Sequence, residues 1–569
     1  MAAAPKITIH EAAIEEHPAV NSILGANPFI DIQPKQLLGM LTELARFLSS
    51  RPDSVLSRMG QLAIDLVQIG LGNSEIAPAA SDKRFTDPAF AQNPVYKRLM
   101  QTYLAWRSSL LDLVQEDQSI HWQDAEQLRF ATMLITEALA PTNTLLGNPG
   151  ALKHAFDSAG LSLVRGIRNF FGDIVNNGAM PAQVDKRPFE VGKNLGVTPG
   201  SVIYRGDLCE VIQYEPRAQK VFARPLLLIP PQINKFYIMD LAPKRSFIEY
   251  ALEHGVQVFA ISWRNPTAAL REKSLDDYVE ACQKAMAIAC EVSGSPDCNV
   301  LGICAGGITT SLTLGHLAAI GDKRVNAGTL LVTMLDTSLP SMTGMFATEE
   351  IVADAIDRSR KKGILEGADM ARVFAWLRPN DLVWNYWVNN YLMGETPSAF
   401  DVLYWNSDGT GMTAQFNHDF SEFVEGNPFV TPGAMKVRGT PIADLADLGV
   451  DSYVLGAKND HLCIWQSVYR SAQLLGGRSR FVLGNSGHIQ TIVCPPENPK
   501  ASFSTNADQS GTPEEWLKGA TRHPGSWWDH GVAWTAEHAG SMVSAPKAPG
   551  NEKYPVLCAA PGTYVHERG

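Results

Sequence analysis

The sequence has few of the features that mark secreted, membrane-spanning or zinc-binding proteins. None of its apolar runs reaches the roughly 18 residues that a transmembrane helix needs. The segment 1–17 carries three glutamates and lacks the basic and apolar regions of a signal peptide, so we expect a cytoplasmic protein. The 8 cysteines are few for 569 residues and form no C-x-x-C pair, which gives no indication of a disulfide framework or a zinc site.

Charge and glycine patterns argue against other function classes. The formal net charge is -11, so the composition gives no indication of a surface that binds nucleic acid or anionic lipid. Neither a Walker-type phosphate loop nor a G-x-G-x-x-G motif occurs, which argues against nucleotide hydrolysis, and no cofactor or metal is predicted. Hydrophobic residues make up 45% and charged residues 19%, an ordinary balance for folded globular domains.

The chain divides into two parts with different hydrophobic patterns. Residues 1–188 carry apolar side chains at helical spacing, such as Met59 and Leu66 or Tyr103 and Leu113, and few strand-like segments. We therefore expect a helical N-terminal domain whose apolar stripes form its core, with contact to an apolar partner surface as the alternative. In residues 189–569, short apolar runs alternate with helical segments, which is typical of a mostly parallel sheet with helices on both faces.

This alternation predicts an α/β core. Strands are expected at 226–229, 258–262, 299–302, 329–335, 453–456 and 481–483, and helices at 244–254, 275–292, 306–319 and 465–475. The alternation breaks at about 337–440, where aromatic residues crowd together around Trp384. In an α/β-hydrolase-like fold an insertion at this point lies over the active site as a cap, and an aromatic insertion without a gating role is the alternative.

The pentapeptide Gly302-Ile303-Cys304-Ala305-Gly306 has the form of a nucleophile elbow with sulfur in place of the usual hydroxyl. It lies between an apolar run and a helical segment, which is the strand, turn and helix context that the elbow needs. The flanking glycines allow a sharp turn and a close approach of substrate. Cys304 is therefore the candidate nucleophile, and the start of the following helix favours its reactive thiolate form. A buried, inert cysteine is the alternative.

Two residues further along the chain fit the acid and the base that such a nucleophile needs. In α/β-hydrolase-like chains these follow in the order nucleophile, acid, histidine. Asp460 and His488 each lie in a loop directly after a predicted strand, so both are expected at the edge where the elbow presents Cys304. His488 is the candidate general base, and Asp460 is the residue that orients it. His461 and Asp336 are rivals for these two roles.

The oxyanion of a tetrahedral intermediate needs backbone N–H donors near the nucleophile. The N–H of Ala305, the residue after the nucleophile, is the first candidate. The second is expected from the loop that follows strand 226–229. Because Pro230 and Pro231 have no N–H, Gln232 or Ile233 is the candidate there.

Several long motifs resemble, in the same order, those of the polyhydroxyalkanoate synthase family. The elbow together with Gly307 is similar to that family's G-x-C-x-G-G element. Other segments that are similar to family signatures are 230–237, 240–241, 262–266, 377–381, 384–390 and 486–489. By position, the family's catalytic cysteine, aspartate and histidine fall on Cys304, Asp460 and His488.

The resemblance implies a homodimer without a transmembrane segment, in which each subunit has a helical N-terminal domain and a capped α/β-hydrolase-like domain. The implied reaction is polymerisation of (R)-3-hydroxyacyl-CoA with release of CoA, at the surface of polyester granules in the cytoplasm. The growing polyester chain and granule-coat proteins are the implied partners. The single long subunit and the C-terminal segment 561–568 look most like the class II, medium-chain type. Thr333 stands where many class II relatives have serine, and its extra methyl group is expected to narrow the acyl pocket, so the chain-length preference stays open.

Two other functions fit the same residues. A thioesterase, esterase or polyester depolymerase has the same constellation with water as the acceptor. In a non-enzymatic granule-coat or scaffold protein, the N-terminal apolar stripes would be the functional part. Sulfur favours the synthase, because a thioester at Cys304 keeps the acyl group activated for transfer to a hydroxyl, whereas serine would hold it as a more stable oxygen ester.

Overall fold

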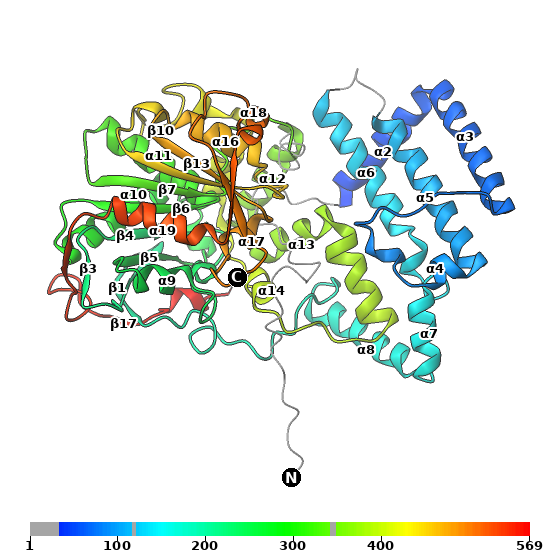
Figure 1. The fold of residues 1–569 in the computed structure, drawn as a ribbon, viewed down its shortest axis with the longest axis horizontal. Coiled ribbons are helices and arrows are strands. Elements are labelled where there is room, and N and C mark those ends of the chain that lie inside the picture. Colours follow the sequence, from blue (N-terminus) through cyan, green and yellow to red (C-terminus); the bar gives the residue numbers. More distant parts are fainter. Residues whose placement is uncertain (1–33, 116–120, 342–348, 569) are drawn as a thin grey trace, which may run out of the picture. The chain divides into compact units, whose positions relative to one another are not determined.

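The computed structural model describes residues 34–115, 121–341 and 349–568 (Figure 1). The chain forms two compact units. One contains the large sheet and comprises Lys186–Ala371 and Phe400–Gly569, and the other is helical and comprises Asp31–Asp185 and Arg372–Ala399. The domain limits at 188 and 189 and the cap limits at 337 and 440 stay predictions, because a compact unit is not by itself an independently folding domain.

An 11-stranded sheet forms the centre of the first unit. Its strand order is β15-β14-β13-β12-β7-β6-β4-β5-β2-β1-β17, and the strands from β13 to β5 in this order run parallel. The strands at both edges are antiparallel. The bounds are β1 (Gly200–Arg205), β2 (Cys209–Tyr214), β4 (Leu226–Ile229), β5 (Val258–Trp263), β6 (Cys298–Ile303), β7 (Val325–Leu331), β12 (Asp451–Ala457), β13 (Ser479–Gly484), β14 (Ser502–Thr505), β15 (Thr521–Pro524) and β17 (Cys558–Ala559).

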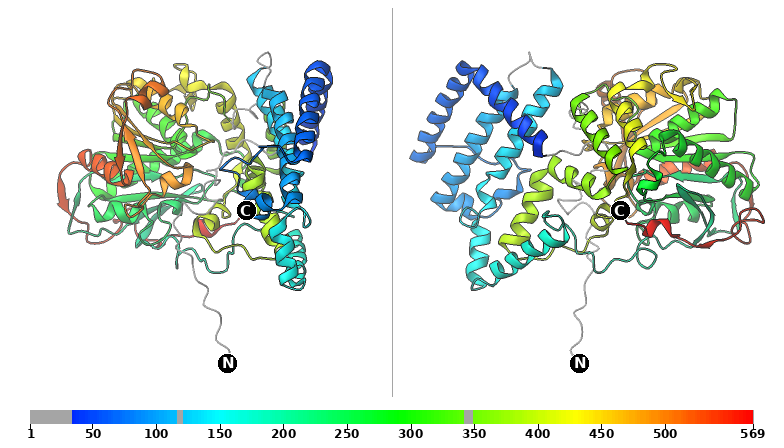
Figure 2. Two further views of the ribbon diagram at one scale, coloured as in Figure 1. Left: turned by 45° about the vertical axis from the view of Figure 1, so that its right-hand side comes forward. Right: turned by 180° about the vertical axis from the view of Figure 1, so that it is seen from behind.

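Helices cover both faces of this sheet (Figure 2). The crossover from β4 to β5 runs along the sheet in the opposite direction from the crossovers β5 to β6 and β6 to β7. Right-handed connections therefore place α9 on one face and α10 and α11 on the other. Phe247 of α9 stacks on Trp527 of α19, with ring centroids 5.5 Å apart. The helices of this unit include α9 (Phe247–Glu253), α10 (Leu275–Ser293), α11 (Ala305–Ala319), α12 (Glu349–Lys362), α14 (Asp401–Asn406), α15 (Ala414–Gly426), α16 (Trp465–Leu474), α17 (His488–Ile492), α18 (Pro513–Lys518) and α19 (Trp527–Glu537).

The predicted fold class is confirmed, and most elements of the core lie where the pattern places them. Strand 226–229 coincides with β4, and the four predicted helices correspond to α9, α10, α11 and α16. The strand predicted at 329–335 exists as β7, but its bounds are wrong, because β7 begins at Val325 and ends at Leu331, and the chain leaves the sheet at Val332, whose φ is 44°. Val332 and Leu335 are nevertheless fully buried, so the apolar run continues beyond the strand. The edge strands β1, β2, β14, β15 and β17 are not among the predicted strands.

The second unit consists of helices and two π-helical turns, as expected for the N-terminal part. Its elements are α2 (Pro34–Ser50), α3 (Pro52–Leu71), α4 (Ala89–Gln92), α5 (Pro94–Gln115), α6 (Trp122–Ala138), α7 (Pro149–Asp157), α8 (Leu161–Asn176) and the turns Asn380–Trp384 and Trp387–Leu392. Helix α13 (Gly367–Leu377) crosses the boundary between the units. Tyr103 and Leu113 are core residues, as predicted. Met59 and Leu66 are 61% and 40% exposed, so the prediction that this stripe is core is wrong.

The aromatic segment of the predicted cap is divided between the two units. Trp384, Trp387 and Tyr391 belong to the helical unit, where Tyr391 meets the ring of Phe170 from α8 edge-on at 5.3 Å. Trp405 belongs to the sheet unit and donates a hydrogen bond of 2.7 Å to the carbonyl of Lys235. These aromatic side chains pack within their own units, and a gating role stays a prediction.

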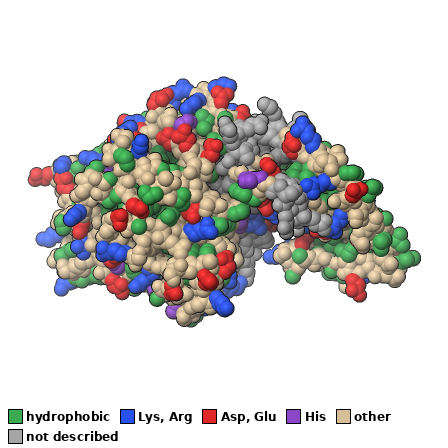
Figure 3. Space-filling view, turned by 90° about the horizontal axis from the view of Figure 1, so that it is seen from above, with side chains coloured by type: hydrophobic (Ala, Val, Ile, Leu, Met, Phe, Trp, Pro, Cys, Tyr) green, Lys and Arg blue, Asp and Glu red, His purple; other side chains and the backbone are tan. Residues whose placement is uncertain are grey.

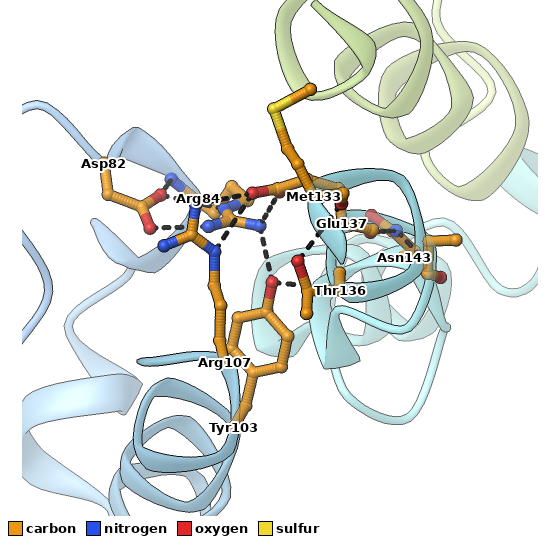
Figure 4. A network of polar contacts seen from close by, with 9 residues as sticks. Asp82, Arg84, Tyr103, Arg107, Met133, Thr136, Glu137 and Asn143 are labelled. Carbon is orange, nitrogen blue, oxygen red and sulfur yellow. Dashed lines mark hydrogen bonds and ion pairs between the residues drawn. The ribbon is translucent and has the colours of Figure 1, made fainter. Parts of the chain in front are cut away.

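A buried ionic network holds three segments of the helical unit together (Figure 4). Arg84, in the short helix Lys83–Phe85, forms ion pairs with Asp82 and with Glu137 of α6. The guanidinium of Arg107 on α5 donates to Glu137 at 3.0 and 3.1 Å. Tyr103 accepts a hydrogen bond from Arg84 at 2.9 Å and donates one to the Thr136 carbonyl at 3.1 Å. Burial raises the pKa of the Tyr103 hydroxyl to about 12, so this hydroxyl stays protonated.

The described surface agrees with the overall composition. In Figure 3, basic and acidic side chains are interspersed over the face that is shown. Among the described residues, none of the helices combines the length and the apolar character that a bilayer-spanning helix requires.

Candidate active site

Cys304 lies at a strained turn between β6 and α11. Its φ of 50° and ψ of -119° are rare for a residue with a Cβ atom, and such strain is typical of a nucleophile elbow. Gly302 and Gly306 make the turn feasible, because a Cβ on Gly302 would overlap Thr310 and one on Gly306 would overlap the carbonyls of Ile229 and Pro230. The turn therefore brings the start of α11 against the end of β4. Cys304 itself is buried, with 8% of its surface exposed to solvent.

Asp460 and His488 lie at the same edge of the sheet as the elbow. The neighbouring parallel strands β12 and β13 end in register, with Ala457 opposite Gly484, and each is followed by one of the two residues. Nδ1 of His488 lies 2.5 Å from Oδ2 of Asp460, and both side chains are buried. The structure thus brings the predicted acid and base into direct contact.

The Asp460 carboxylate is held in place by the backbone of its own loop. Its Oδ1 accepts hydrogen bonds from the N–H groups of Leu462 at 2.9 Å and Cys463 at 3.1 Å, which leaves Oδ2 for the histidine. Because Asp460 engages Nδ1, the ring presents its buried Nε2 to the nucleophile. This arrangement fixes the orientation of the imidazole.

The thiol of Cys304 and the ring of His488 influence each other strongly. A hydrogen bond from the Cys463 thiol lowers the pKa of Cys304, burial opposes this, and a hydrogen bond and Coulombic attraction to His488 lower it further, to about 5. Burial disfavours a charged imidazole, but the Asp460 carboxylate and the Cys304 thiol outweigh it and raise the pKa of His488 to about 10. Both directions favour a thiolate and imidazolium pair at neutral pH.

The two rivals contact other groups. Oδ1 of Asp336 accepts hydrogen bonds from the Ser338 N–H at 2.9 Å and the Asn427 side chain at 3.0 Å. Its other oxygen lies 3.8 Å from Arg470. His461 is partly exposed, and its ring Nδ1 lies 3.3 Å from the Asn459 carbonyl. The contacts therefore favour Asp460 and His488, although the catalytic role of Cys304, Asp460 and His488 stays a prediction.

The predicted oxyanion donors flank the elbow. Ala305 is the first residue of α11, and Ile233 is buried in the loop after β4. The Gln232 side chain donates a hydrogen bond of 2.8 Å to Thr309 of α11, which holds this loop against the helix that follows the nucleophile. The roles of Ala305 and Ile233 in binding an oxyanion, and of Gln232 as the alternative, stay predictions.

Cys463 is a site residue that the sequence does not reveal. It lies three residues after Asp460, is buried, and its thiol hydrogen-bonds the Cys304 sulfur, which raises the pKa of Cys463 well above the ordinary value. A single cysteine in a loop, without a partner cysteine nearby in the sequence, has no motif that marks it. Only the return of the chain to the same sheet edge places it beside Cys304.

Thr333 lies beneath the elbow. Its hydroxyl donates a hydrogen bond of 3.0 Å to the Leu331 carbonyl and lies 3.5 Å from the Cys304 carbonyl. A Cβ on Gly307 would overlap the Thr333 side chain, so Thr333 packs directly against the first turn of α11. A substitution here is therefore expected to move the elbow.

Comparison with known proteins gives two family matches. Residues 81–251 match the family described as "Poly-beta-hydroxybutyrate polymerase (PhaC) N-terminus", and residues 225–493 match the alpha/beta hydrolase fold. The second match agrees with the sheet order and the elbow, and the fold class is confirmed.

The similarity to individual proteins extends over nearly the whole chain. Poly(3-hydroxyalkanoate) polymerase 1 from Ectopseudomonas oleovorans is 48% identical over 550 residues, which cover 97% of this chain and 98% of the relative. Polymerase 2 from the same organism is 45% identical over 95% of this chain and 96% of the relative. The poly(3-hydroxyalkanoate) polymerase subunit PhaC from Cupriavidus necator is 38% identical over 87% of this chain and 84% of the relative.

Proposed function

Because this chain belongs to the poly(3-hydroxyalkanoate) polymerase family, we propose that it polymerises (R)-3-hydroxyacyl-CoA into a polyester with release of CoA. Cys304 is the nucleophile, His488 the proton carrier and Asp460 the residue that orients and charges the histidine. The observation that carries this assignment is the buried chain of contacts from Asp460 through His488 to Cys304 at a strained elbow.

In the first half-reaction the Cys304 thiolate attacks the thioester carbonyl of the substrate. The oxyanion that forms is placed near the start of α11, where the N–H of Ala305 and one from the loop at Ile233 are the proposed donors. When the carbon–sulfur bond to CoA breaks, the imidazolium of His488 gives its proton to the leaving CoA thiolate. The product is an acyl thioester on Cys304, whose free energy is close to that of the substrate.

In the second half-reaction a 3-hydroxyl group attacks this acyl thioester. His488, now neutral, accepts the hydroxyl proton at Nε2 while the new carbon–oxygen bond forms and the Cys304 thiolate leaves. The exchange of a thioester for a more stable oxygen ester drives chain growth. Water competes for the same acyl group, and the aromatic segment 376–405 is proposed to exclude it.

The remaining features come to this chain through the family. We propose that it acts as a homodimer on polyester granules in the cytoplasm, together with granule-coat proteins and without a cofactor. The preference between short and medium acyl chains stays open, because the class II resemblance favours medium chains whereas the methyl group that Thr333 adds beneath the elbow favours short ones. A series of 3-hydroxyacyl-CoA substrates from four to twelve carbons measures this preference directly.

The decisive experiment gives purified protein (R)-3-hydroxybutyryl-CoA and measures both released CoA and insoluble polyester. We expect both products from the parent and neither from Cys304→Ala, whereas Cys282→Ala, at a buried cysteine of α10, keeps the parent rate. Release of CoA with only free 3-hydroxy acid would show a thioesterase instead. Unchanged CoA release by the Cys304→Ala variant would overturn the proposed nucleophile.

A further inference from the structure

Three side chains with metal-binding atoms meet beside the nucleophile. Ligand atoms of Asp460, Cys463 and His488 all lie within 4.8 Å of one another, and all three residues are buried. Two of them belong to the proposed catalytic group, and the thiol of Cys463 hydrogen-bonds the Cys304 sulfur without taking part in the bond-making steps described above.

We propose that Asp460, Cys463 and His488 form a binding site for a thiophilic divalent cation such as Zn²⁺, and that the bound cation blocks the enzyme. Cysteine sulfur, imidazole nitrogen and carboxylate oxygen are the three ligand types that zinc takes in proteins. The cation is an inhibitor and has no part in the reaction.

The spacing of the three ligands suits a small tetrahedral cation. Zinc binds sulfur at about 2.3 Å and nitrogen or oxygen at about 2.0–2.2 Å, so its ligand atoms lie roughly 3.3–3.8 Å apart in a tetrahedron. Atoms that already lie within 4.8 Å of one another reach this geometry by side-chain movements of about 1 Å. No rearrangement of the backbone is needed.

The ring nitrogen that serves this site is set by Asp460. Nδ1 of His488 faces the Asp460 carboxylate and Nε2 faces Cys304, so a cation bound by Asp460 takes Nδ1 and replaces the proton between these two side chains. The thiol of Cys304 interacts with Cys463 and His488, so a second sulfur lies next to the site. A donor set of sulfur, nitrogen and oxygen selects zinc over magnesium or calcium.

Cys463 decides whether the site exists. Without it only a carboxylate and an imidazole remain from the cluster, and these are engaged with each other at 2.5 Å. With Cys463 present, the cation gains a thiolate ligand. The bound cation then replaces the protons of the thiol and of the imidazole. A cation held there occupies His488 and lies beside Cys304, so neither is available to substrate. This last consequence rests on the proposed function, whereas the binding itself does not.

The test begins with binding, measured without any activity. Reduced, metal-free, full-length protein is titrated with Co²⁺, whose thiolate charge-transfer absorption reports sulfur ligands, and Zn²⁺ is measured by competition with a chromophoric chelator. We expect one equivalent bound by the parent and at least about tenfold weaker binding by Cys463→Val and by His488→Gln, since even the loss of an outer-shell partner costs about 10–100-fold. Cys282→Val, at a buried cysteine of α10, is the matched control and binds as the parent does.

Two further measurements make the result unambiguous. Thermal melting establishes whether each variant is folded. If Cys463→Val is not folded, Cys463→Ser, which nearly preserves the side-chain size, is used in its place. X-ray absorption of the zinc-loaded parent counts the sulfur ligands and is expected to find one or two. Zinc binding that survives both Cys463 substitutions, or a spectrum without sulfur, would overturn the site.

Inhibition is measured last, as CoA release with increasing Zn²⁺, each variant relative to its own metal-free rate. The inhibitory concentration is expected to rise at least tenfold in Cys463→Ser. Binding without inhibition in the parent would overturn the proposed block. A parent that releases no CoA even without metal would refute the proposed function and leave the binding result as it stands.

Discussion

Asp460→Asn tests the most important contact in the proposed mechanism. The asparagine side chain has nearly the same shape, but it removes the negative charge that lies 2.5 Å from Nδ1 of His488. It also offers an N–H group where the ring needs an acceptor. The variant therefore weakens the charged form of the histidine and permits the wrong ring tautomer, while the buried loop around residue 460 keeps its size.

The expected magnitude follows from the contact distance and the burial of both groups. The centres of the two charges lie about 4 Å apart, and at an effective dielectric constant of about 20 their attraction is roughly 4 kcal/mol. Every 1.36 kcal/mol of lost transition-state stabilisation lowers the rate about tenfold. We therefore expect kcat to fall by roughly 10²–10³-fold, with KM changed much less, because Asp460 contacts the histidine and is not expected to contact the substrate.

The assay is CoA release from (R)-3-hydroxybutyryl-CoA at saturating substrate, with Asp336→Asn as the matched control. Asp336 is also a mostly buried carboxylate in a loop after a central strand, but its partners are Ser338, Asn427 and Arg470. The control is expected to stay within about threefold of the parent. A kcat for Asp460→Asn within tenfold of the parent, or a larger loss in Asp336→Asn, would refute the assignment of the acid.

Three further predictions concern the nucleophile, the elbow and the helical unit. Because the pKa of Cys304 is lowered to about 5, its alkylation rate by iodoacetamide is expected to stay level from pH 8 to pH 6 and to fall about tenfold per pH unit below 5; a rate that rises tenfold per unit between pH 6 and 8 would contradict this, and Cys304→Ala removes the reaction. Thr333→Ser removes the methyl group that packs beneath the elbow, and the resulting shift of the elbow is expected to raise kcat/KM for ten-carbon relative to four-carbon substrates about 10-fold, the lower end of what one methyl group changes in specificity; an unchanged ratio would exclude Thr333 from specificity. Glu137→Ala leaves the buried Arg84 with Asp82 alone, removes the carboxylate partner of Arg107, and is expected to lower the free energy of unfolding of the protein by about 3 kcal/mol in urea denaturation, whereas Glu43→Ala, at an exposed ion pair, costs under about 1 kcal/mol.

The sequence predicts those parts of the fold whose local pattern and tertiary environment agree. The strand β4 and the elbow at Cys304 are examples, because β4 is a short apolar run that ends at two prolines, and the elbow is a short apolar run followed by glycines. The pattern fails at β7, where Asn326 and Gly328 lie within the strand and the apolar residues continue to Leu335 beyond it. Burial alone keeps that run hydrophobic, and hydrophobicity cannot distinguish a buried strand from a buried loop.

The candidate site shows the same division. Asp460 and His488 follow strands, so the parallel topology itself predicts that they meet. The position of Cys463 beside Cys304 depends on how a loop returns to the sheet edge, and the aromatic segment is divided between two units by tertiary packing. The periodicity of the sequence predicts neither. The exposed Met59 and Leu66 of α3 likewise show helical spacing that is real, although these side chains are not covered in the described structure.

The contacts around His488 explain how one histidine serves both half-reactions of the proposed mechanism. At rest, the Asp460 carboxylate and the Cys304 thiolate together raise the pKa of the imidazole, so it carries the proton that the leaving CoA needs. Acylation turns the thiolate into a neutral thioester and removes one of the two negative charges. The pKa of the imidazole must then fall, and once its proton has left with CoA the ring is a base at the moment when the incoming hydroxyl needs one. The same reasoning requires Asp460 to keep its contact with Nδ1 in both half-reactions, and the two backbone N–H groups that bind its Oδ1 hold the carboxylate in that orientation.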